Sequence, residues 1–574
     1  MAIIALCSFV LWKIYESTLD DYNYLGIVES PSALGVFNDY AVSTDAKPCA
    51  KIGSDLLAKG GSAVDAAIGT LLCMGVVLPN SLGLGGGCLM TIYDRSKKKA
   101  TIIDGRETAP DYAHEQMFVA DPITASRGPL SIGIPGELAA YWKAHQMFGK
   151  LNWSELFDDT ILMAENGHPV VEHVAYALTG WSHTRYFTPP LAKALTNNKT
   201  GKFLAEGETL VQKELANTLR RIRDNGEAEF YRGLTGQLLI EDLKQQGGKI
   251  TLENLKRYQA EVKQPLHFKL ADDLHLYTQP PPGSGIVLSI ILRLMHELGY
   301  YRNTQTSSSF ESSSLYYHHL IEAFKFAYAQ RAAIEDQPDD PKRMEDLMKT
   351  LMSDAFIKQS ASKIDNVTHS PDYYGGVQYF QDDHGTAHVS VVDKEGNAVA
   401  VTTSVNLYFG SGLYSPRTGI VYNDVMDDFV SPNITNRFNL MPSKYNRIRP
   451  GKKPLSSMAP SIFTDSNGDV RLVIGASGGA KITTAIAMVS LRHLYLGDDI
   501  KSSIDCHRIH HQYLPNVIWF EKEFPKSLLY SLGERGHETT AIVGRSSVVM
   551  AIANDTHKIT ANSDYRKGGT VDGI

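Results

Sequence analysis

Residues 382–406, DDHGTAHVSVVDKEGNAVAVTTSVN, constrain the fold most strongly, because they contain two alternating apolar runs on either side of a turn. In the first run, Thr386 and His388 fall on one face of a strand, while Ala387 and Val389 fall on the other. The polar segment DKEGN then reverses the chain, and AVAVTTSVN returns as a second strand. These residues therefore predict an antiparallel β-hairpin with hydroxyl side chains at both ends.

The rest of the chain mixes helical and strand patterns without an internal repeat, which indicates an α+β fold. At 574 residues the chain exceeds the usual single-domain range, so it contains either two domains or one large intertwined domain. Apolar periodicity predicts helices at 286–300 and 315–331. VRLVIGASGG at 470–479 predicts a buried strand that runs into a glycine turn and a further helix. The polar segments 304–314 and 335–342 are predicted to be exposed loops.

Composition and motifs exclude several classes of function. The chain is 43% hydrophobic and 21% charged with a formal net charge of -7, so it lacks the basic excess expected of a nucleic-acid-binding protein. It has no H-E-x-x-H, paired C-x-x-C or P-loop motif, and GLGGGC at 83–88 lacks the glycine spacing of a dinucleotide fingerprint. We interpret His318 and His319 as packing or surface residues, and HRIHH at 507–511 lacks the acidic or cysteine companion that a metal site needs. The sequence therefore contains no motif that predicts a metal site or a nucleotide site.

Two of the five cysteines lie at matching positions of a predicted helical hairpin. Apolar periodicity predicts two helices that meet at Gly60-Gly61. Cys49 lies eleven residues before Gly60 and Cys73 twelve residues after Gly61, so antiparallel packing brings the two cysteines level. A Cys49–Cys73 disulfide is therefore predicted, with two buried free thiols as the alternative. The cysteines without an evident partner are Cys7, Cys88 and Cys506, so the chain is not a disulfide-framework protein.

The N-terminus has features of a targeting segment. Residues 2–12 are apolar, but this run is shorter than the ~20 residues that a membrane span needs. We therefore predict that residues 1–28 form a signal peptide or a short membrane anchor and stalk, with a frayed apolar terminus as the alternative. Five sequons are compatible with a secretory route, at Asn152, Asn198, Asn366, Asn433 and Asn554. These features predict a protein that is secreted or held at the cell surface as a single-pass type II membrane protein.

Two segments offer a nucleophile. GASGG at 475–479 fits the G-x-S-x-G turn of serine hydrolases, with Ser477 as nucleophile and the later DDIKSSIDCHRIHH as the source of an acid and a histidine. The hairpins and loops before it do not match the run of βα units expected in that fold. Gly385-Thr386 offers the second chemistry, because a threonine that becomes the first residue of a chain can pass its proton to its own α-amine, whose reference pKa is about 7.7 to 8.0. This mechanism requires cleavage before Thr386, whereas a Gly-Thr pair that only opens a strand requires none.

Longer blocks of sequence resemble the γ-glutamyltransferase family, which belongs to the N-terminal nucleophile hydrolases. The blocks are GTAHVSVVDKEGNAVAVTTSVN, NDVMDDF, KPLSSMAPSI, VIGASGGAKITTA and SAVDAAIGTLLCMGVVLPNSLGLGGG, and the similarity extends from Ala41 to the C-terminal SDYRKGG. The resemblance implies a four-layer αββα sandwich and self-cleavage into a large subunit (29–385) and a small catalytic subunit (386–574), intertwined in one domain. It also implies transfer of the γ-glutamyl group of glutathione or its conjugates to water, amino acids or dipeptides, without a cofactor.

The resemblance also implies roles for individual residues. The catalytic assignments are Thr386 as nucleophile, Ser404 as the hydroxyl that supports it, and Gly478 and Gly479 as the oxyanion hole. Adjacent N–H groups at a helix start favour the last assignment independently. The donor-binding assignments are Arg106, Ser456 and Ser457 for the α-carboxylate, and Asn406 and Asp428 for the α-ammonium. The planar fork of an arginine can bind both oxygens of a carboxylate.

One position departs from the family pattern. Val425 stands in NDVMDDF where relatives usually have a glutamate or glutamine that contacts the donor's amino group. Loss of that partner is expected to cost about 1.5 to 3 kcal/mol of donor binding, roughly a ten- to hundredfold weakening. Neighbouring Asp424 is expected to point the other way, as the adjacent residue of an extended segment. Val425 therefore leaves a second interpretation open, a weakly active or inactive homologue that acts as a secreted binding protein.

Overall fold

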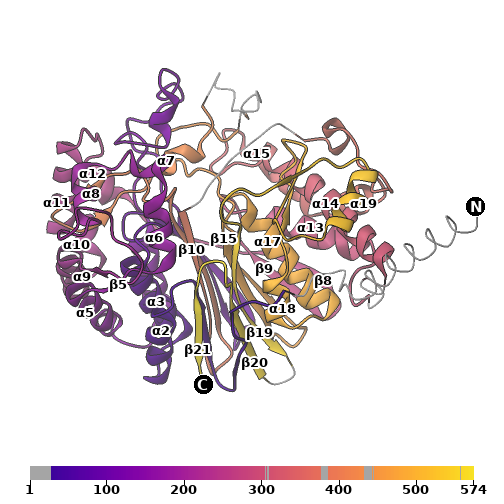
Figure 1. The fold of residues 1–574 in the computed structure, drawn as a ribbon, viewed down its shortest axis with the longest axis horizontal. Helices are drawn as coiled ribbons and strands as arrows, with labels where there is room; N and C mark the ends of the chain where they lie inside the picture. Colours follow the sequence, from indigo (N-terminus) through magenta and orange to yellow (C-terminus); the bar gives the residue numbers. More distant parts are fainter. Residues whose placement is uncertain are drawn as a thin grey trace, which may run out of the picture.

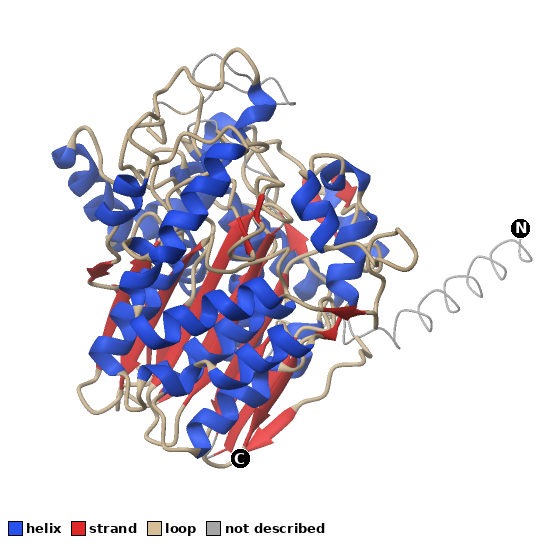
Figure 2. Ribbon diagram, turned by 90° about the vertical axis from the view of Figure 1, so that its left-hand side faces the viewer, coloured by secondary structure: helices blue, strands red, loops and turns tan. Residues whose placement is uncertain are grey.

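Two seven-stranded sheets lie face to face, and helices cover the outer side of each sheet (Figures 1 and 2). The computed structural model describes residues 28–303, 306, 309–376, 385–431, 443, 445–555 and 558–574. One hydrophobic cluster joins each sheet to its helices, and a third cluster lies between the two sheets. In Figure 1 the indigo and purple helices of the first half of the chain cover one sheet, and the later helices cover the other. The predicted four-layer αββα sandwich of the N-terminal nucleophile hydrolase type is therefore confirmed.

All neighbouring strands within the two large sheets run antiparallel. The first sheet has the order β1 (Gly35–Phe37), β20 (Lys558–Ser563), β19 (Val548–Asp555), β15 (Val470–Ser477), β14 (Ser461–Thr464), β9 (Leu274–Thr278) and β8 (Leu266–Ala271). The second has the order β21 (Thr570–Gly573), β2 (Ala41–Thr44), β10 (Gly385–Val392), β11 (Ala398–Asn406), β3 (Gly87–Asp94), β4 (Lys99–Gly105) and β7 (Glu261–Lys263). Smaller sheets contain β5 (His168–Pro169) with β6 (Thr209–Leu210), β12 (Tyr414–Ser415) with β13 (Ile420–Val421), and β16 (Ile509–His510), β17 (Ile518–Phe520) and β18 (Thr539–Ala541).

The helices form the two outer layers. On the side of the second sheet lie α2 (Cys49–Ala58), α3 (Ala63–Val77), α4 (Glu137–Phe148), α5 (Asp158–Asn166), α6 (Glu172–Thr179), α7 (Trp181–Thr184), α8 (Pro189–Ala194), α9 (Lys213–Asn225), α10 (Glu227–Tyr231), α11 (Leu234–Gln245) and α12 (Leu252–Arg257). On the other side lie α13 (Gly285–Glu297), α14 (Phe310–Arg331), α15 (Pro341–Met352), α16 (Asp354–Ala361), α17 (Lys481–Ser490) with a π-helical continuation (Leu491–Leu496), α18 (Ile500–Asp505) and α19 (Lys526–Glu534). A short 3₁₀ helix, η4 (Val425–Asp428), follows β13.

Strands β10 and β11 are buried along their whole length because both faces of their sheet are covered. Ala387 and Val389 belong to the cluster on the helical side of the sheet. Ser390 points the opposite way, and its Oγ lies 3.4 Å from the carbonyl oxygen of Val473 in the facing sheet. The predicted hairpin and its alternation are confirmed, and the face that carries Thr386 lies between the two sheets.

Helices α2 and α3 form the predicted antiparallel hairpin. Cys49 begins α2 and Cys73 lies in the last turns of α3, and their Cα atoms are 5.5 Å apart across a disulfide bond. The Cys49–Cys73 prediction is confirmed. Of the other cysteines, Cys88 and Cys506 are buried free thiols, and Cys7 lies outside the described residues.

Two predicted loops are wrong in part. Helix α14 begins at Phe310, inside the predicted loop 304–314. Polar composition alone does not distinguish a solvated loop from a helix whose serine hydroxyls are hydrogen-bonded, as they are here. The segment 335–342 begins with a buried Glu335, which forms an ion pair of 3.0 Å with the buried Lys452. That partner lies 117 residues away, so the local sequence could not indicate it.

The targeting segment and one sequon lie outside the described residues, namely 1–27 and Asn433. No helix in the described part of the chain is both long and apolar enough to cross a membrane. The remaining sequon asparagines divide into the exposed Asn152, Asn198 and Asn366 and the half-buried Asn554 in β19. The exposed three can reach a glycosylating enzyme without a change of structure.

Candidate active site

Thr386 lies at the start of β10, where the hairpin contains a bulge. Gly385 is opposite Asn406, whereas Thr386 is opposite Ser404. The Oγ of Ser404 lies 2.5 Å from the carbonyl oxygen of Gly385 and 3.1 Å from Oγ1 of Thr386, and it accepts the N–H of Asn406 at 2.8 Å. Because a carbonyl oxygen can only accept, the single Ser404 proton goes to Gly385, and the Thr386 hydroxyl donates to Ser404. The Thr386 hydroxyl is thus held beside the peptide bond that precedes it.

Contacts between the sheets fix how β10 lies against β15. Ser390 Oγ lies 3.4 Å from the carbonyl oxygen of Val473. The ring of His388 lies against Gly475, where a Cβ atom would be only 2.1 Å from the ring carbon Cε1. Ser390 thus faces Val473 and His388 faces Gly475, so facing residues are two positions earlier in β10 for every two positions later in β15. The glycine at 475 is required by the histidine ring and not by a serine-hydrolase turn.

The next step of two residues places Thr386 opposite Ser477, at the end of β15. Gly478 and Gly479 follow with φ angles of 124° and 61°, in the region that glycine adopts most easily. Within the described residues, no acceptor binds the main-chain N–H of either glycine. Helix α17 begins shortly afterwards, at Lys481. Two free N–H groups at a helix start can bind a developing negative charge.

His388 is a buried residue of the site that the sequence analysis did not assign. Its Nδ1 lies 2.9 Å from Oγ1 of Thr402, and its Nε2 lies 3.0 Å from Oγ of Ser390. Burial lowers its pKa to about 3, so the ring is neutral at physiological pH. The sequence signal that could have revealed it is Gly475, a glycine inside an apolar strand.

The serine-hydrolase alternative lacks its catalytic partners. Asp498 forms an ion pair of 2.6 Å with Arg492, and His510 is hydrogen-bonded to Thr484 at 2.8 Å. Within the described residues no histidine is hydrogen-bonded to Ser477. The described residues therefore do not assemble a Ser-His-Asp triad around this serine.

Arg106 lies directly after β4 and is 1% exposed. One of its terminal nitrogens pairs with Asp428, and the other lies 3.3 Å from Glu107. Its Nε donates to the carbonyl oxygen of Pro454 at 3.4 Å, which brings the arginine to the start of the PLSSM segment. Burial raises the pKa of Glu107 to about 7, although the Arg106 charge acts in the opposite direction.

Of the other predicted donor-binding residues, Ser456 and Ser457 lie in the PLSSM segment and Asn406 ends β11. The carbonyl oxygen of Ser456 accepts a hydrogen bond of 2.6 Å from the Ser284 hydroxyl. The carbonyl oxygen of Ser457 accepts the hydroxyl of Thr483 in α17 at 3.1 Å. Asn406, two residues after Ser404 in β11, has φ 80°, a conformation that asparagine tolerates better than most residues. The two serines thus link the PLSSM segment to Ser284 and to α17.

Val425 is fully buried in η4. It fills the space beside Gly133, where a Cβ atom would lie 2.3 Å from Cγ1 of Val425. The Asp424 side chain accepts the main-chain N–H of Leu407 at 2.9 Å and so points to the end of β11. Burial raises the pKa of Asp424 well above its usual value. The Asp424 carboxylate is therefore directed to the end of β11, so we do not expect it to replace the glutamate or glutamine that the family resemblance predicts at position 425.

Comparison with known proteins identifies the family. The family model described as gamma-glutamyltranspeptidase matches residues 49–574. The chain belongs to the gamma-glutamyltranspeptidase family. Scoloptoxin SSD14 from Scolopendra dehaani is 44% identical over 95% of this chain and 94% of its own, and glutathione hydrolase 5 proenzyme from Homo sapiens is 34% identical over 95% of this chain and 94% of its own. Cephalosporin acylase from Bacillus halodurans shares the fold, with a TM-score of 0.81 at 22% identity, covering 95% of this chain and 98% of that chain.

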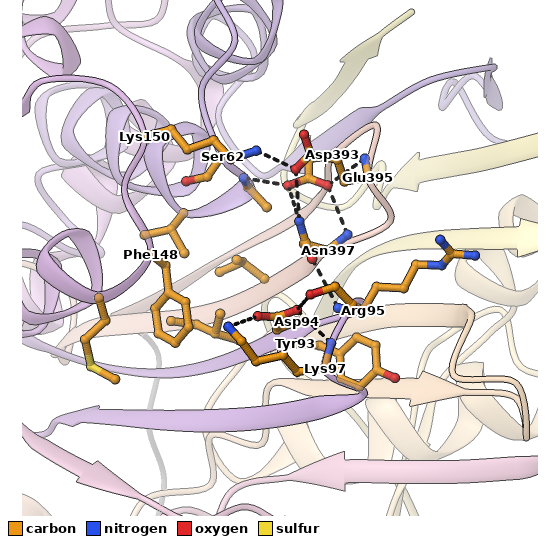
Figure 3. Close-up of a pocket in the computed structure, with 16 residues that line it drawn as sticks. Ser62, Tyr93, Asp94, Arg95, Lys97, Phe148, Lys150, Asp393, Glu395 and Asn397 are labelled. Atoms are coloured by element: carbon orange, nitrogen blue, oxygen red, sulfur yellow. Dashed lines mark hydrogen bonds and ion pairs between the residues drawn. The ribbon is translucent and has the colours of Figure 1, made fainter.

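A separate pocket of this transpeptidase-family chain lies at the turn of the β10–β11 hairpin (Figure 3). Thr386 lies at the other end of the hairpin. It contains the turn residues Asp393 and Asn397, and Asp393 accepts the main-chain N–H of Ala63 at 3.2 Å. Because β10 rises by about 3.3 Å per residue, this pocket is roughly 20 Å from the threonine. It therefore does not belong to the catalytic site.

Two residues of α14, His318 and Glu322, and His537, which follows α19, resemble a metal-ligand set, since their ligand atoms lie within 4.8 Å of one another. His318 Nδ1 lies 2.8 Å from His537 Nε2, and His318 Nε2 lies 2.8 Å from the carbonyl oxygen of Asp365. Lys325 Nζ lies 3.4 Å from the remaining nitrogen of His537. The carbonyl can only accept, so each ring donates one proton and accepts another. Hydrogen bonds thus occupy every ring nitrogen, as expected of packing histidines.

Proposed function

We propose that the protein is a glutathione hydrolase and γ-glutamyltransferase whose nucleophile, Thr386, is released by self-cleavage after Gly385. The hydrogen-bonded group of Gly385, Thr386 and Ser404 is the observation that carries the proposal. Membership of the family supports the activity, and the human relative is named both a glutathione hydrolase and a proenzyme. Val425 is the departure from this pattern that bears on donor binding.

Self-cleavage begins when Oγ1 of Thr386 attacks the carbonyl carbon of Gly385. Ser404 stabilises the negative charge that develops on the carbonyl oxygen, because its hydroxyl already donates to that oxygen. The C–N bond between Gly385 and Thr386 then breaks, and the nitrogen of Thr386 takes the proton that the Thr386 hydroxyl gives up. An ester between Gly385 and the Thr386 oxygen now joins the two fragments. Water hydrolyses the ester to give a carboxylate at Gly385 and a free hydroxyl and amine on Thr386. The products are the proposed large subunit, which ends at Gly385, and the small subunit, which begins at Thr386.

In the mature enzyme the free amine of Thr386 accepts the proton of its own hydroxyl. The hydroxyl oxygen attacks the γ-carbonyl carbon of the donor, and the N–H groups of Gly478 and Gly479 bind the oxyanion. The proton passes to the departing amine, which is cysteinylglycine when glutathione is the donor, and a γ-glutamyl ester remains on the threonine. Water, an amino acid or a dipeptide then attacks the ester and regenerates the enzyme.

Donor recognition exchanges one ion pair for two. Without a donor, Arg106 and Asp428 neutralise each other in a buried environment. A γ-glutamyl donor brings an α-carboxylate for Arg106 and an α-ammonium for Asp428, so both buried charges keep a partner throughout. Asn406 adds a polar contact for the ammonium, and Ser456 and Ser457 add hydroxyl donors for the carboxylate.

Residues 1–28 act in this proposal as a signal or a short anchor that brings the enzyme to the cell surface or the extracellular space. The confirmed Cys49–Cys73 disulfide supports an oxidising compartment, since such bonds are rare in the reducing cytosol. Exposed sequons at Asn152, Asn198 and Asn366 agree with the same route.

Intact mass and N-terminal sequencing of the purified protein test the proposal, together with release of the amine from a γ-glutamyl anilide. The wild type is expected to yield a fragment that begins at Thr386 and to turn over the anilide. Thr386→Ala is expected to remain one chain and to be inactive. Ser477→Ala is expected to keep most of the activity, whereas a serine hydrolase would lose it. An uncut chain that hydrolyses the anilide would contradict the mechanism.

A further inference from the structure

The carbonyl oxygen of the proposed nucleophile accepts a hydrogen bond from a buried ion pair. Lys567 Nζ lies 2.7 Å from the carbonyl oxygen of Thr386 and 2.6 Å from Oδ2 of Asp45. The side chains of Lys567 and Asp45 are 1% and 0% exposed. Asp45 directly follows β2, and Lys567 lies between β20 and β21. The two residues come from the proposed large and small subunits, respectively, and meet at Thr386.

The Lys567–Asp45 pair lies just beyond the end of β2, the strand beside β10. Strand β2 pairs with β10 from Val389, opposite Thr44, to Val392, so the nucleophile's end of β10 extends beyond its partner. Lys567 donates there to the carbonyl oxygen of Thr386, and the Asp45 carboxylate pairs with its ammonium. The ammonium thus replaces one donor of the missing strand, and it satisfies a main-chain carbonyl oxygen that would otherwise be buried without this partner.

The backbone around the pair leaves it little freedom to move. A Cβ atom on Gly569 would lie 2.2 Å from the carbonyl oxygen of Thr44 and 2.6 Å from Cα of Asp45. The hydroxyl of Ser563 donates to the same Thr44 oxygen at 2.9 Å. The segment that carries Lys567 is therefore packed directly against the residue that carries Asp45, and the ammonium has a fixed position.

We propose that Lys567, held by Asp45, is a positioning residue that fixes the main chain of Thr386 for self-cleavage and orients its free amine in the mature enzyme. The inference rests on the proposed function, because it assigns a role at the same threonine. A misplacement of about 1 Å at a reacting group can cost about a hundredfold in rate. Loss of the Lys567 contact is therefore expected to affect both reactions of Thr386.

The ammonium also has an electrostatic consequence for the mature enzyme. Nitrogen and carbonyl oxygen of one residue are at most about 3.6 Å apart by covalent geometry, so Lys567 Nζ lies within roughly 6 Å of the Thr386 amine. A like charge at this range disfavours the protonated amine and favours the base form. The Asp45 carboxylate opposes this effect. The other charged or titratable groups near the pair are Arg545, whose charge acts in the same direction, and the buried His173 and His388, which burial keeps neutral.

The test compares the full-length wild type with Lys567→Met, which keeps a side chain of similar length without the charge. Lys567→Met is expected to slow self-cleavage at least tenfold. In the fraction that does cleave, kcat for a γ-glutamyl anilide falls while KM changes little, because Lys567 does not contact the donor. The acidic limb of the kcat profile moves upward by about one pH unit, because the like charge that disfavours the protonated amine has been removed.

A matched control is Lys325→Met, since Lys325 is also a buried lysine, 3.2 Å from Glu322 in α14. It is expected to lower thermal stability without changing the cleavage rate or the acidic limb. Asp45→Asn keeps the shape of the site, and it is expected to slow cleavage even if Lys567→Met does not fold. Wild-type cleavage in either Asp45→Asn or Lys567→Met would overturn the inference. A wild type that neither cleaves nor turns over the anilide would instead refute the proposed function.

Discussion

Substitution of Ser404 by alanine removes one hydroxyl from the centre of the cleavage site. That hydroxyl donates to the carbonyl oxygen of Gly385 at 2.5 Å and lies 3.1 Å from Oγ1 of Thr386. The first contact strengthens as negative charge develops on the carbonyl oxygen, whereas the second only orients the attacking hydroxyl. Ser404→Ala therefore removes transition-state stabilisation from self-cleavage more than it removes structure.

The size of the effect follows from the number of donors lost. Removal of one donor to a developing oxyanion costs about 2.7 to 4 kcal/mol, or a factor of about 10² to 10³ in rate. Ser404 is 4% exposed, so water does not readily replace the missing hydroxyl. The N–H of Asn406 also loses its acceptor, which is expected to lower stability by about 1 to 3 kcal/mol. The half-time of cleavage is therefore expected to rise at least a hundredfold.

The assay follows newly synthesised 63.3 kDa chain on a denaturing gel as it divides into two fragments. Ser404→Thr is the matched control, because threonine retains the hydroxyl and suits a strand. It is expected to cleave within about tenfold of the wild-type rate. A wild-type half-time in Ser404→Ala would refute the proposed role of this hydroxyl.

Two further predictions concern buried side chains of the site. The pKa of His388 is about 3 in the folded protein and about 6.5 in the unfolded protein. Below pH 6.5 the unfolded state therefore binds more protons than the folded state. The free energy of unfolding is expected to decrease by about 2 kcal/mol as the pH is lowered from 7 to 5. His388→Gln should abolish this part of the pH dependence in denaturant unfolding of uncleaved chain, exposed His114→Gln should not, and an unchanged slope in His388→Gln would contradict the assigned burial effect. Val425→Glu should lower the KM for glutathione about ten- to hundredfold. It should also lower the melting temperature, because the side chain at this position is fully buried. Val425→Leu serves as the apolar control, and an unchanged or higher KM in Val425→Glu would count against a role of this position in donor binding.

Patterns confined to a few neighbouring residues predicted the structure well. The alternation around Thr386 gave the hairpin, and the two apolar faces that meet at Gly60-Gly61 gave the disulfide between Cys49 and Cys73. The layered fold came from longer blocks of sequence that resemble the family. In each case the deciding information lies within one segment of the chain.

Contacts between distant segments could not be predicted in the same way. Lys567 meets the carbonyl oxygen of Thr386 across 181 residues and Asp45 across 522. Nothing in the local sequence of either partner indicates the other, since an isolated lysine or aspartate is usually solvated. The ring of His388 is similar, because its burial depends on a glycine in the facing sheet. Only the assembled sheets bring these groups together.

The strand order of the second sheet decides what happens to the molecule after the proposed cleavage. Strands β10 and β11, which follow the cut, lie between β2 and β3, which precede it, and β21 closes the far edge beside β2. Neither fragment can dissociate without breaking the hydrogen bonds between strands in the middle of a buried sheet. The mature enzyme should therefore unfold in one thermal transition that includes both fragments. Fragments expressed as separate chains would have to fold together, because neither can form its part of the sheet alone.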